Sequence, residues 1–477
     1  MKILFAASEV YPLVKTGGLA DVAGALPLAL AGLGLDMRVM LPAYRQVREG
    51  AGFTGKEIFL GDPFGSGEMR LREAKLPGSG LKLLLLDCPA LFDRPGGPYQ
   101  REDGAEWPDN DIRFAALAYA AAALARTDNP LGWRPDIIHA NDWQTGLVPA
   151  YLEFHGNRDV KCVFTIHNLQ YQGRFSRDIL DRVLIPQSAF SPEGLEFYGA
   201  ACYLKSGIFY ADHITTVSRT YAEEIRTPAF GWGMEGILQA RAAHLSGIVN
   251  GIDTAIWNPE NDPHIACNYT AGSLNRKAQN KAALQAGLGL PQIPDAPLFG
   301  VVSRLAEQKG IDLVLQVIPD ILAMGGQLAV LGTGDAYWED ALRQQAQQSP
   351  SVSAAIAYRE ELSHRIIAGS DMFLMPSRFE PCGLTQLYAL GYGTAPIVRR
   401  TGGLADTVQD MDKGKEGTGF VFDEASAPAL RDAITRAVDL YKNTDGWQNM
   451  QRRAMKQDFS WDRSARDYVK LYTSLLK

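Results

Sequence analysis

The chain has 477 residues, of which 46% are hydrophobic and 21% are charged, so it can bury a large core and is too long for one ordinary domain. Its formal net charge of −7 argues against a nucleic-acid partner and favours a neutral or small anionic substrate. Its five cysteines are scattered and form no CxxC pair, which argues against a disulfide framework and against a zinc site.

The first residues, MKILFAASEV, contain one lysine, a short apolar stretch and then Glu9. This pattern predicts a first β-strand and not a signal peptide. The most apolar later run, Phe114–Ala125, is too short to span a bilayer. We therefore expect a soluble, cytoplasmic protein that has no membrane partner.

Apolar runs of strand length then alternate with amphipathic stretches of helix length. Near-continuous hydrophobicity is typical of parallel strands that are covered on both faces. The strands expected in the first half are Ile3–Ala7, Met37–Leu41, Leu83–Leu86, Asp136–His139, Val163–Ile166, Ile214–Val217 and Gly247–Val249.

A polar stretch, Asp253–Asn280, interrupts the alternation, so we place a domain junction near its start. The strands expected after it are Phe299–Ser303, Gln327–Leu331, Ala354–Tyr358, Met372–Met375, Pro396–Val398 and Gly419–Phe422. The helices expected between and after them are Ile311–Met324, Tyr337–Gln348, Glu361–Ser370, Leu384–Gly391 and Ala427–Tyr441. The alternation predicts two doubly wound α/β domains, and the pattern alone makes the last amphipathic stretch, Trp461–Lys477, a cap on the second.

The hexapeptide TGGLAD occurs twice, at Thr16–Asp21 and at Thr401–Asp406, and follows Lys15 in the first copy and Arg400 in the second. Paired glycines between a strand and a helix let backbone N–H groups approach an anion closely. Two copies suggest two half-sites that face one cleft and hold a phosphorylated substrate. For a single copy, an ordinary strand-to-helix turn is the simpler interpretation.

Two cations, Arg304 and Lys309, lie in the loop between a predicted strand and a predicted helix. Fixed cations beside a helix start suit a diphosphate, especially one that departs with growing negative charge. The competing interpretation is a solvated loop that happens to be basic, which we would accept for one lysine alone.

A carboxylate, Glu380, comes shortly after another predicted strand and just before a turn that should open a helix. That turn offers the N–H groups of Gly383, Leu384 and Thr385 to an anion. A carboxylate beside anion-binding amides suggests a substrate with both hydroxyls and phosphates, hence a nucleotide-activated sugar. A plain helix N-terminal charge is the alternative for Glu380.

Several motifs in a fixed order make the chain resemble the bacterial glycogen synthases and plant starch synthases. They are KTGGLADV, HANDW at His139–Trp143, TIHNLQYQG at Thr165–Gly173, VNGID at Val249–Asp253, SRL-x-x-QKG at Ser303–Gly310, SRFEPCGLTQLY and RTGGLADTV. The resemblance covers essentially the whole chain. It implies the GT-B architecture, which has two Rossmann-like domains and an active-site cleft between them. The implied domains are residues 1–250, residues 251–458, and a final helix over residues 459–477 that packs back on the first domain.

The resemblance also implies the reaction, which is transfer of glucose from ADP-glucose to the non-reducing end of an α-1,4-glucan with retention of configuration. By the same resemblance, Arg304 and Lys309 hold the diphosphate, and Lys15 with the Gly17–Gly18 backbone closes over it. The remaining implied roles are adenine stacking by Tyr358, the sugar pocket by His167, Asn250 and Glu380, and the acceptor side by Tyr99, Asp142 and Trp143. We also expect donor binding by the turn Cys382, Gly383, Leu384 and Thr385. The residues expected to be catalytic are Glu380, His167, Arg304, Lys309 and Asp142.

One position departs from many other retaining GT-B enzymes, which carry a second glutamate eight positions after the first. This chain has Tyr388 there, and glycogen and starch synthases share the loss of that glutamate. We expect no metal or other cofactor, because the acidic pairs Asp109/Asp111 and Asp410/Asp412 look like a helix start and a solvated turn.

Three alternatives remain open on the sequence. One is a related GT-B enzyme with another nucleotide-sugar donor or another acceptor. A nicotinamide oxidoreductase is disfavoured, because no G-x-G-x-x-G turn follows the first strand. A non-catalytic glucan-binding protein would bind polymer and ignore nucleotide sugar.

Overall fold

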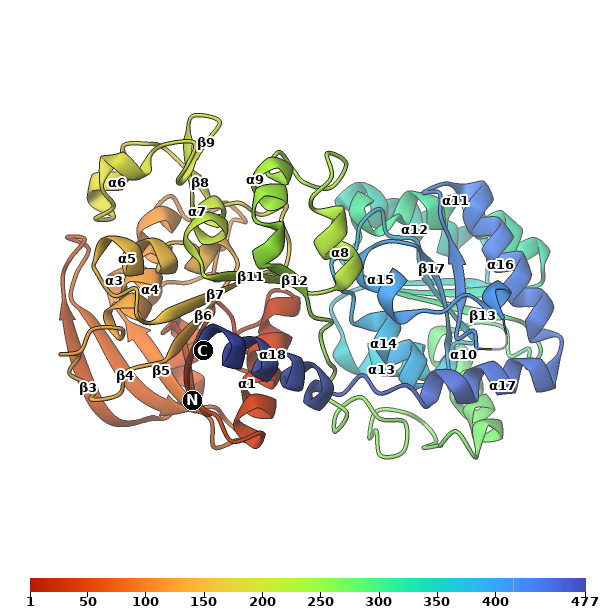
Figure 1. Cartoon of the computed structure of the whole chain (residues 1–477). Coiled ribbons are helices and arrows are strands. Elements are labelled where there is room, and N and C mark those ends of the chain that lie inside the picture. The colour runs from red at the N-terminus through yellow and green to blue at the C-terminus, as the bar shows by residue number, and fades with distance from the viewer. Residues whose placement is uncertain (415) are drawn as a thin grey trace. The chain divides into compact units, whose positions relative to one another are not determined.

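The computed structural model describes residues 1–414 and 416–477, and it divides into two compact units. The first unit comprises Met1–Gly251 together with Trp461–Lys477, and the second comprises Ile252–Ser460. Each unit has its own central sheet with helices packed on it (Figure 1). The limits expected from the sequence, after residues 250 and 458, lie next to these.

The first unit is built on a nine-stranded sheet of order β12-β11-β7-β6-β1-β2-β5-β4-β3. Its strands from β12 through β1 to β5 pair in parallel, and β3 and β4 add an antiparallel edge. The strand bounds are β1 Lys2–Ala6, β2 Asp36–Pro42, β3 Phe53–Gly61, β4 Met69–Lys75, β5 Lys82–Asp87, β6 Ile137–Asn141, β7 Lys161–Ile166, β11 His213–Thr216 and β12 Leu245–Gly247. The strand order reverses at β1, which lies between β6 and β2, and this is where doubly wound sheets bind ligands.

The strands that the sequence did not indicate are the antiparallel pair β3 and β4 and three very short strands. In β3 a single residue, Ile58, is fully buried, and in β4 buried residues alternate with half-exposed ones. A small separate sheet of β8 Arg174–Phe175, β10 Ala200–Cys202 and β9 Glu196–Phe197 is equally short of apolar runs. A search for continuous apolar runs finds strands covered on both faces and passes over these.

The helices of the first unit are α1 Gly18–Gly32, α2 Arg45–Gly50, α3 Pro89–Phe92, α4 Asn110–Ala123, α5 Val148–Phe154, α6 Ile179–Arg182, α7 Tyr203–Tyr210, α8 Arg219–Glu224, α9 Glu235–Ala240 and α18 Trp461–Leu475. Helix α18 packs beside α1 (Figure 1). The Tyr472 hydroxyl of α18 lies 2.6 Å from Nδ1 of the buried His139 in β6. The last helix therefore belongs to the first unit. Its amphipathic pattern alone had predicted a cap on the second unit, and that prediction is wrong.

The second unit has a six-stranded parallel sheet of order β15-β14-β13-β16-β17-β18. Its strands are β13 Leu298–Val302, β14 Gln327–Gly332, β15 Val352–Ile356, β16 Met372–Met375, β17 Ala395–Arg399 and β18 Phe420–Phe422. Its helices are α10 Lys277–Leu288, α11 Ile311–Ala323, α12 Ala336–Gln348, α13 Glu360–Gly369, α14 Thr385–Gly391, α15 Gly402–Thr407, α16 Ala427–Tyr441 and α17 Thr444–Met455. The order reverses between β13 and β16, and the prediction of two doubly wound α/β domains is confirmed.

Helix α10 begins inside the polar stretch that we expected to be a junction. Its lysines are buried, because their amines have partners: Lys277 Nζ donates to the Ala368 carbonyl at 2.6 Å and to Thr394 Oγ1 at 2.7 Å. Burial lowers the pKa of Lys277 to about 7. Among the described residues, no helix combines the length and the apolarity needed to cross a bilayer.

Candidate active site

In the second unit, the loops after the neighbouring strands β13 and β16 are joined by hydrogen bonds. The Arg378 N–H donates to the Gln308 carbonyl at 2.8 Å, and Gln308 Nε2 donates to the Phe379 carbonyl at 3.1 Å. Gly310, at φ +69°, allows the approach, because a Cβ there would lie 2.2 Å from the Pro376 carbonyl oxygen. The two predicted motifs, one with two cations and one with a carboxylate, thus meet where the strand order reverses.

Lys309 and Glu380 form an ion pair at the centre of these loops. Lys309 Nζ lies 2.5 Å from Glu380 Oε2, and the Ser377 hydroxyl donates to the same oxygen at 3.0 Å. Glu380 is only 5% exposed, so these partners take the place of water around its carboxylate. Arg304 is exposed, and its Nη2 donates to Gln308 at 3.1 Å. The predicted cations and the predicted carboxylate therefore belong to one cluster.

The second TGGLAD copy packs against this cluster. The Gly403 N–H donates to the Glu380 carbonyl at 3.1 Å. A Cβ on Gly402 would lie 1.9 Å from that carbonyl oxygen, and one on Gly403 would lie 2.0 Å from the Cys382 carbonyl oxygen. Gly17 and Gly18 of the first copy have no such neighbour within 4 Å among the described residues. The two copies are therefore not equivalent half-sites, and the second supports the Glu380 backbone.

The turn that opens α14 is held by one side chain. Gln386 Nε2 donates to the carbonyls of Cys382 and Gly383, each at 2.9 Å, and Gly383 has φ +72°. Cys382 is buried, Leu384 precedes the helix, and α14 begins at Thr385. The predicted donor-binding turn is therefore rigid through its own carbonyls.

Two tyrosines of the second unit differ sharply in exposure. Tyr358 lies two residues beyond the end of β15 and is 74% exposed. Tyr388, eight positions after Glu380, stacks on Trp257 with ring centroids 3.8 Å apart. The other stacking partner of Trp257 is His364, at 3.7 Å. Tyr388 thus helps to pack the segment that begins the second unit.

In the first unit, Asp142 follows β6 with an unusual φ of 56°. Its N–H donates to the Thr165 carbonyl at 2.9 Å, and its Oδ1 accepts the His167 N–H at 2.7 Å. Burial raises the pKa of Asp142 to about 7, although the hydrogen bonds that its carboxylate accepts from backbone N–H groups lower the pKa. The carboxyl of Asp142 is thereby fixed at the carboxyl ends of β6 and β7.

The imidazole of His167 has a defined tautomer. Its Nε2 lies 2.9 Å from Asn141 Oδ1, while the Asn141 amide nitrogen donates to the carbonyls of Ala6 and His139 at 3.0 and 3.3 Å. Because the Asn141 oxygen must accept, Nε2 of His167 carries the proton and Nδ1 is an acceptor. Burial lowers the pKa of His167 to about 3, so the ring is neutral.

Two other residues of the HANDW motif have packing contacts. His139 lies inside β6, fully buried between Tyr472 and Thr165, and burial lowers its pKa to about 3. Trp143 packs edge-on against Phe114 at 4.9 Å, and a Cβ on Gly173 would lie 2.3 Å from its ring. The prediction that this strand ends at His139 is wrong, because β6 continues to Asn141.

The loop after β1 contains the first TGGLAD copy and depends on a residue that the sequence analysis missed. The carboxylate of Glu9 accepts the N–H groups of Thr16 and Gly17, the latter at 3.1 Å, and it also accepts the Tyr99 hydroxyl. The Gly17 N–H that we expected on a diphosphate is therefore used within the loop. Lys15 Nζ lies 2.8 Å from Asp21 Oδ1.

Asn250 lies after β12, near the end of the first unit's long segment. It is buried, and its Oδ1 accepts no hydrogen bond from any residue that the structure describes. A buried amide oxygen without a partner is costly and is typical of a site that binds a ligand or water.

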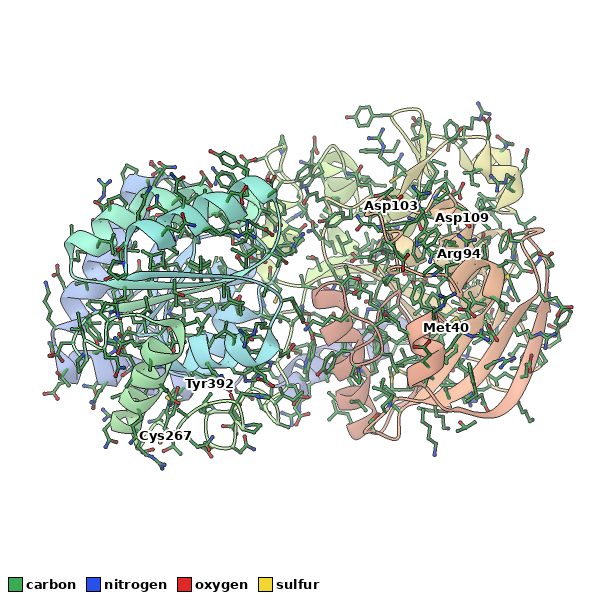
Figure 2. The ribbon with its side chains drawn as sticks, turned by 180° about the vertical axis from the view of Figure 1, so that it is seen from behind. Met40, Arg94, Asp103, Asp109, Cys267 and Tyr392 are labelled. Atoms are coloured by element: carbon green, nitrogen blue, oxygen red, sulfur yellow. The ribbon has the colours of Figure 1, made fainter. Side chains whose placement is uncertain are left out.

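The acidic pairs considered for a metal have basic partners. Arg94 binds Asp109 through two hydrogen bonds of 2.9 and 2.7 Å, and Figure 2 labels both residues side by side. Asp410 is buried and accepts from Arg436 at 3.0 Å, so the prediction that it lies in a solvated turn is wrong. Within residues 1–414 and 416–477, no three His, Cys, Asp or Glu side chains are grouped as they would be around a metal ion.

Comparisons with known proteins agree with this arrangement. Residues 2–240 match the family model "Starch synthase catalytic domain", and residues 290–456 match "Glycosyl transferases group 1". Similar curated relatives include glycogen synthases from Paramagnetospirillum magneticum, 54% identical over 100% of this chain and 98% of the relative, and from Rhodospirillum rubrum, 52% identical over 100% and 99%.

Solved structures extend the likeness to three dimensions. The catalytic domain of starch synthase IV from Arabidopsis thaliana, bound to ADP and acarbose, aligns with a TM-score of 0.89 at 32% identity and 99% coverage of both chains. A sucrose-phosphate synthase from Thermosynechococcus elongatus, at 19% identity and a TM-score of 0.62, shares the fold. The chain is a glycosyltransferase with the two Rossmann-like domains of the GT-B class. Within that class, it belongs to the glycogen synthase and starch synthase family.

Proposed function

We propose that this chain transfers glucose from ADP-glucose to the non-reducing end of an α-1,4-glucan, with retention of configuration, without a metal, and in the cytoplasm. Full-length similarity to glycogen synthases supports the reaction. The ADP in the starch synthase structure supports the choice of nucleotide. The observation that carries the proposal is the Lys309–Glu380 pair beside Arg304, at the point where the strand order of the second unit reverses.

The donor would be held mainly by the second unit. Arg304 and Lys309 supply positive charge for the diphosphate, and the exposed ring of Tyr358 supplies a stacking face for adenine. The N–H groups of the turn before α14 add further donors. Lys15 and the start of α1 at Gly18 would add positive charge for a diphosphate.

Three polar groups are proposed to bind the transferred glucose. The proposed contacts are the Glu380 carboxylate, Nδ1 of the neutral His167 and the buried Oδ1 of Asn250. Each of these can accept a hydrogen bond from a sugar hydroxyl. Asp142 and Trp143, with Tyr99, would define the acceptor side.

Breaking the bond between glucose and phosphate creates a cation-like sugar and an anionic ADP. A fixed cation aimed at the developing charge lowers such a barrier by about 3 kcal/mol. The Glu380 carboxylate is paired with the Lys309 ammonium and accepts a hydrogen bond from Ser377, which makes it a poor nucleophile and supports attack from the same face. In that route the acceptor hydroxyl forms the new glycosidic bond, and its proton passes to the leaving phosphate.

The test is incorporation of labelled glucose from ADP-glucose into glycogen in the presence of EDTA. We expect label that is released by enzymes specific for α-1,4 linkages, which reports both the bond formed and the retained configuration. No incorporation, loss of activity with the chelator, or a β-linked product would each contradict the proposal.

A further inference from the structure

Glu9 occupies a position that the proposed roles do not explain. It follows β1 at the point where the strand order of the first unit reverses, and it is only 3% exposed. Burial raises the pKa of its carboxyl, while its hydrogen bonds act in the opposite direction. Burying a carboxylate away from water is costly, and the hydrogen-bond donors that Glu9 accepts all come from the protein. Its place at this edge of the sheet therefore calls for a structural or functional role.

Both oxygens of Glu9 have partners, and these come from distant parts of the chain. Oε2 accepts the N–H groups of Thr16 and Gly17, which lead into α1. Oε1 accepts the hydroxyl of Tyr99, which also lies 2.8 Å from the Ser8 hydroxyl. The carboxylate therefore connects the Lys15–Gly18 loop to the segment that contains Tyr99.

Tyr99 is itself held rigidly. Its segment is closed by the Arg94–Asp109 ion pair labelled in Figure 2. The Tyr99 carbonyl accepts from the Asn110 side chain at 3.0 Å and from the Trp107 N–H at 3.1 Å. These contacts fix the position of the Tyr99 hydroxyl, which donates to Glu9. A hydroxyl that already donates to a carboxylate is less available to a glucan.

We propose that Glu9 is a positioning residue for the donor: its carboxylate holds the Thr16 and Gly17 N–H groups so that Lys15 and the start of α1 face the diphosphate, and Tyr99 acts through Glu9. This inference rests on the proposed function for the identity of the donor. It changes the role of Tyr99 from acceptor contact to support of the donor loop. The Gly17 N–H is then part of that support, and Gly18 is the first backbone donor left for the phosphate.

The experiment compares Glu9→Ala, Glu9→Gln and Tyr99→Phe, with Asp87→Asn as a matched control. Asp87 is also a buried carboxylate of the first unit, but its partners are Arg48 and Arg72. We measure kcat, the KM for ADP-glucose and for glycogen, and the Kd for ADP. Hydrogen exchange of the peptide that covers Lys15–Gly18 reports the loop independently of any activity.

Glu9→Ala should raise the ADP-glucose KM and the ADP Kd about tenfold, and it should speed exchange in the loop, because two N–H groups lose their acceptor. The glycogen KM should stay within about twofold, since Glu9 touches no acceptor group in this account. Glu9→Gln should recover most of the loss, because its amide oxygen can accept both N–H groups and its NH₂ can donate to the Tyr99 hydroxyl. Asp87→Asn should change stability without changing either KM.

Tyr99→Phe decides between the two roles of the tyrosine. If Tyr99 acts through Glu9, the variant should raise the ADP-glucose KM by about two- to threefold in the wild-type background and should add nothing to Glu9→Ala. The proposal is overturned if Tyr99→Phe raises the glycogen KM, if its effect multiplies with that of Glu9→Ala, or if loop exchange is unchanged in Glu9→Ala. Should Glu9→Ala not fold, Glu9→Gln and Tyr99→Phe still decide the question. Failure of wild-type transfer would refute the proposed function, whereas unchanged loop exchange refutes the role of Glu9.

Discussion

At the scale of single residues, Lys309 has two anionic partners, the Glu380 carboxylate and, in the proposed reaction, the diphosphate. It neutralises the buried Glu380 carboxylate in the structure described here, and in the proposed reaction it also faces the diphosphate. A compact ammonium with three donors can do both, because its hydrogen bonds are not confined to one plane. Removing it should therefore affect turnover more than ground-state binding.

We expect Lys309→Ala to lower kcat by about 10²- to 10³-fold, the range found when one fixed donor to a developing charge is lost. Steady-state kinetics with ADP-glucose and glycogen measure this. Lys442→Ala, which removes an exposed lysine paired with Asp439 in the same unit, is the control and should be neutral. A kcat for Lys309→Ala within twofold of the wild type would reject the proposed role.

The carboxyl of Asp142 should leave a signature in the pH dependence of stability. Burial raises its pKa to about 7, so the folded protein keeps a proton that the unfolded chain, with an ordinary Asp pKa of about 3.9, releases. The free energy of unfolding therefore falls as pH rises through this window, because the folded state binds the extra proton. Asp142→Asn cannot titrate and removes this fall.

Urea unfolding at several pH values between 4.5 and 7.5 measures the effect. The stability of Asp142→Asn relative to the wild type should increase with pH. In the control, Asp128→Asn, the replaced carboxyl has its pKa lowered by the Arg126 hydrogen bond, so no such increase is expected. A pH-independent difference for Asp142→Asn would mean that the carboxyl titrates normally in the fold.

At the scale of elements, one hexapeptide serves two structural purposes. In both copies the hexapeptide opens a helix: α1 begins at Gly18, the second glycine of its copy, and α15 begins at Gly402, the first glycine of its copy. The second pair of glycines is buried against the backbone near Glu380 and Cys382, whereas the first pair has open space around it. The same local sequence forms a helix start in both copies, and the segment packed against it determines whether its glycines are needed for close packing.

Replacing the second glycine of each copy by alanine should thus affect stability differently in the two copies. Gly403→Ala puts a Cβ 2.0 Å from a backbone carbonyl oxygen and should destabilise the protein by more than about 2 kcal/mol. Gly18→Ala should leave stability unchanged within about 0.5 kcal/mol and raise the ADP-glucose KM, if a phosphate approaches that backbone. Denaturant unfolding and donor kinetics on both variants check this, and equal loss of stability would contradict the structure.

The sequence predicted those elements that are covered on both faces. Strands such as β13 and β16 and the helix α16 have apolar patterns that follow from their burial. The edge strand β3 and its neighbour β4 were not predicted, because they expose one side. Helix α10 was hidden because its polar residues are buried with partners, which no periodicity reveals.

The candidate site divides in the same way. Arg304, Lys309 and Glu380 stand in compact motifs next to strand ends, so the sequence could identify them. Glu9 could not be identified, since its importance depends on Tyr99, which lies 90 positions away. One feature of the sequence does point to Glu9: it is an acidic residue shortly after the first strand, where doubly wound sheets bind ligands.

At the scale of the whole molecule, each unit repeats one design. Its strand order reverses once, beside β1 in the first unit and between β13 and β16 in the second, and the polar residues gather in the loops at that point. Two doubly wound sheets give one chain two edges at which ligands can bind. Membership of the glycogen synthase family makes a nucleotide sugar and a glucan the natural occupants of these edges.

The central claim is that this chain uses an adenine nucleotide sugar to extend a glucan. The most direct measurement is a competition for transfer to glycogen between equimolar ADP-glucose and UDP-glucose, each with a distinct label. We predict that at least about nine-tenths of the incorporated glucose comes from ADP-glucose, since a tenfold preference needs only about 1.4 kcal/mol of differential binding. Preferential incorporation from UDP-glucose, or none from either donor, would contradict the account.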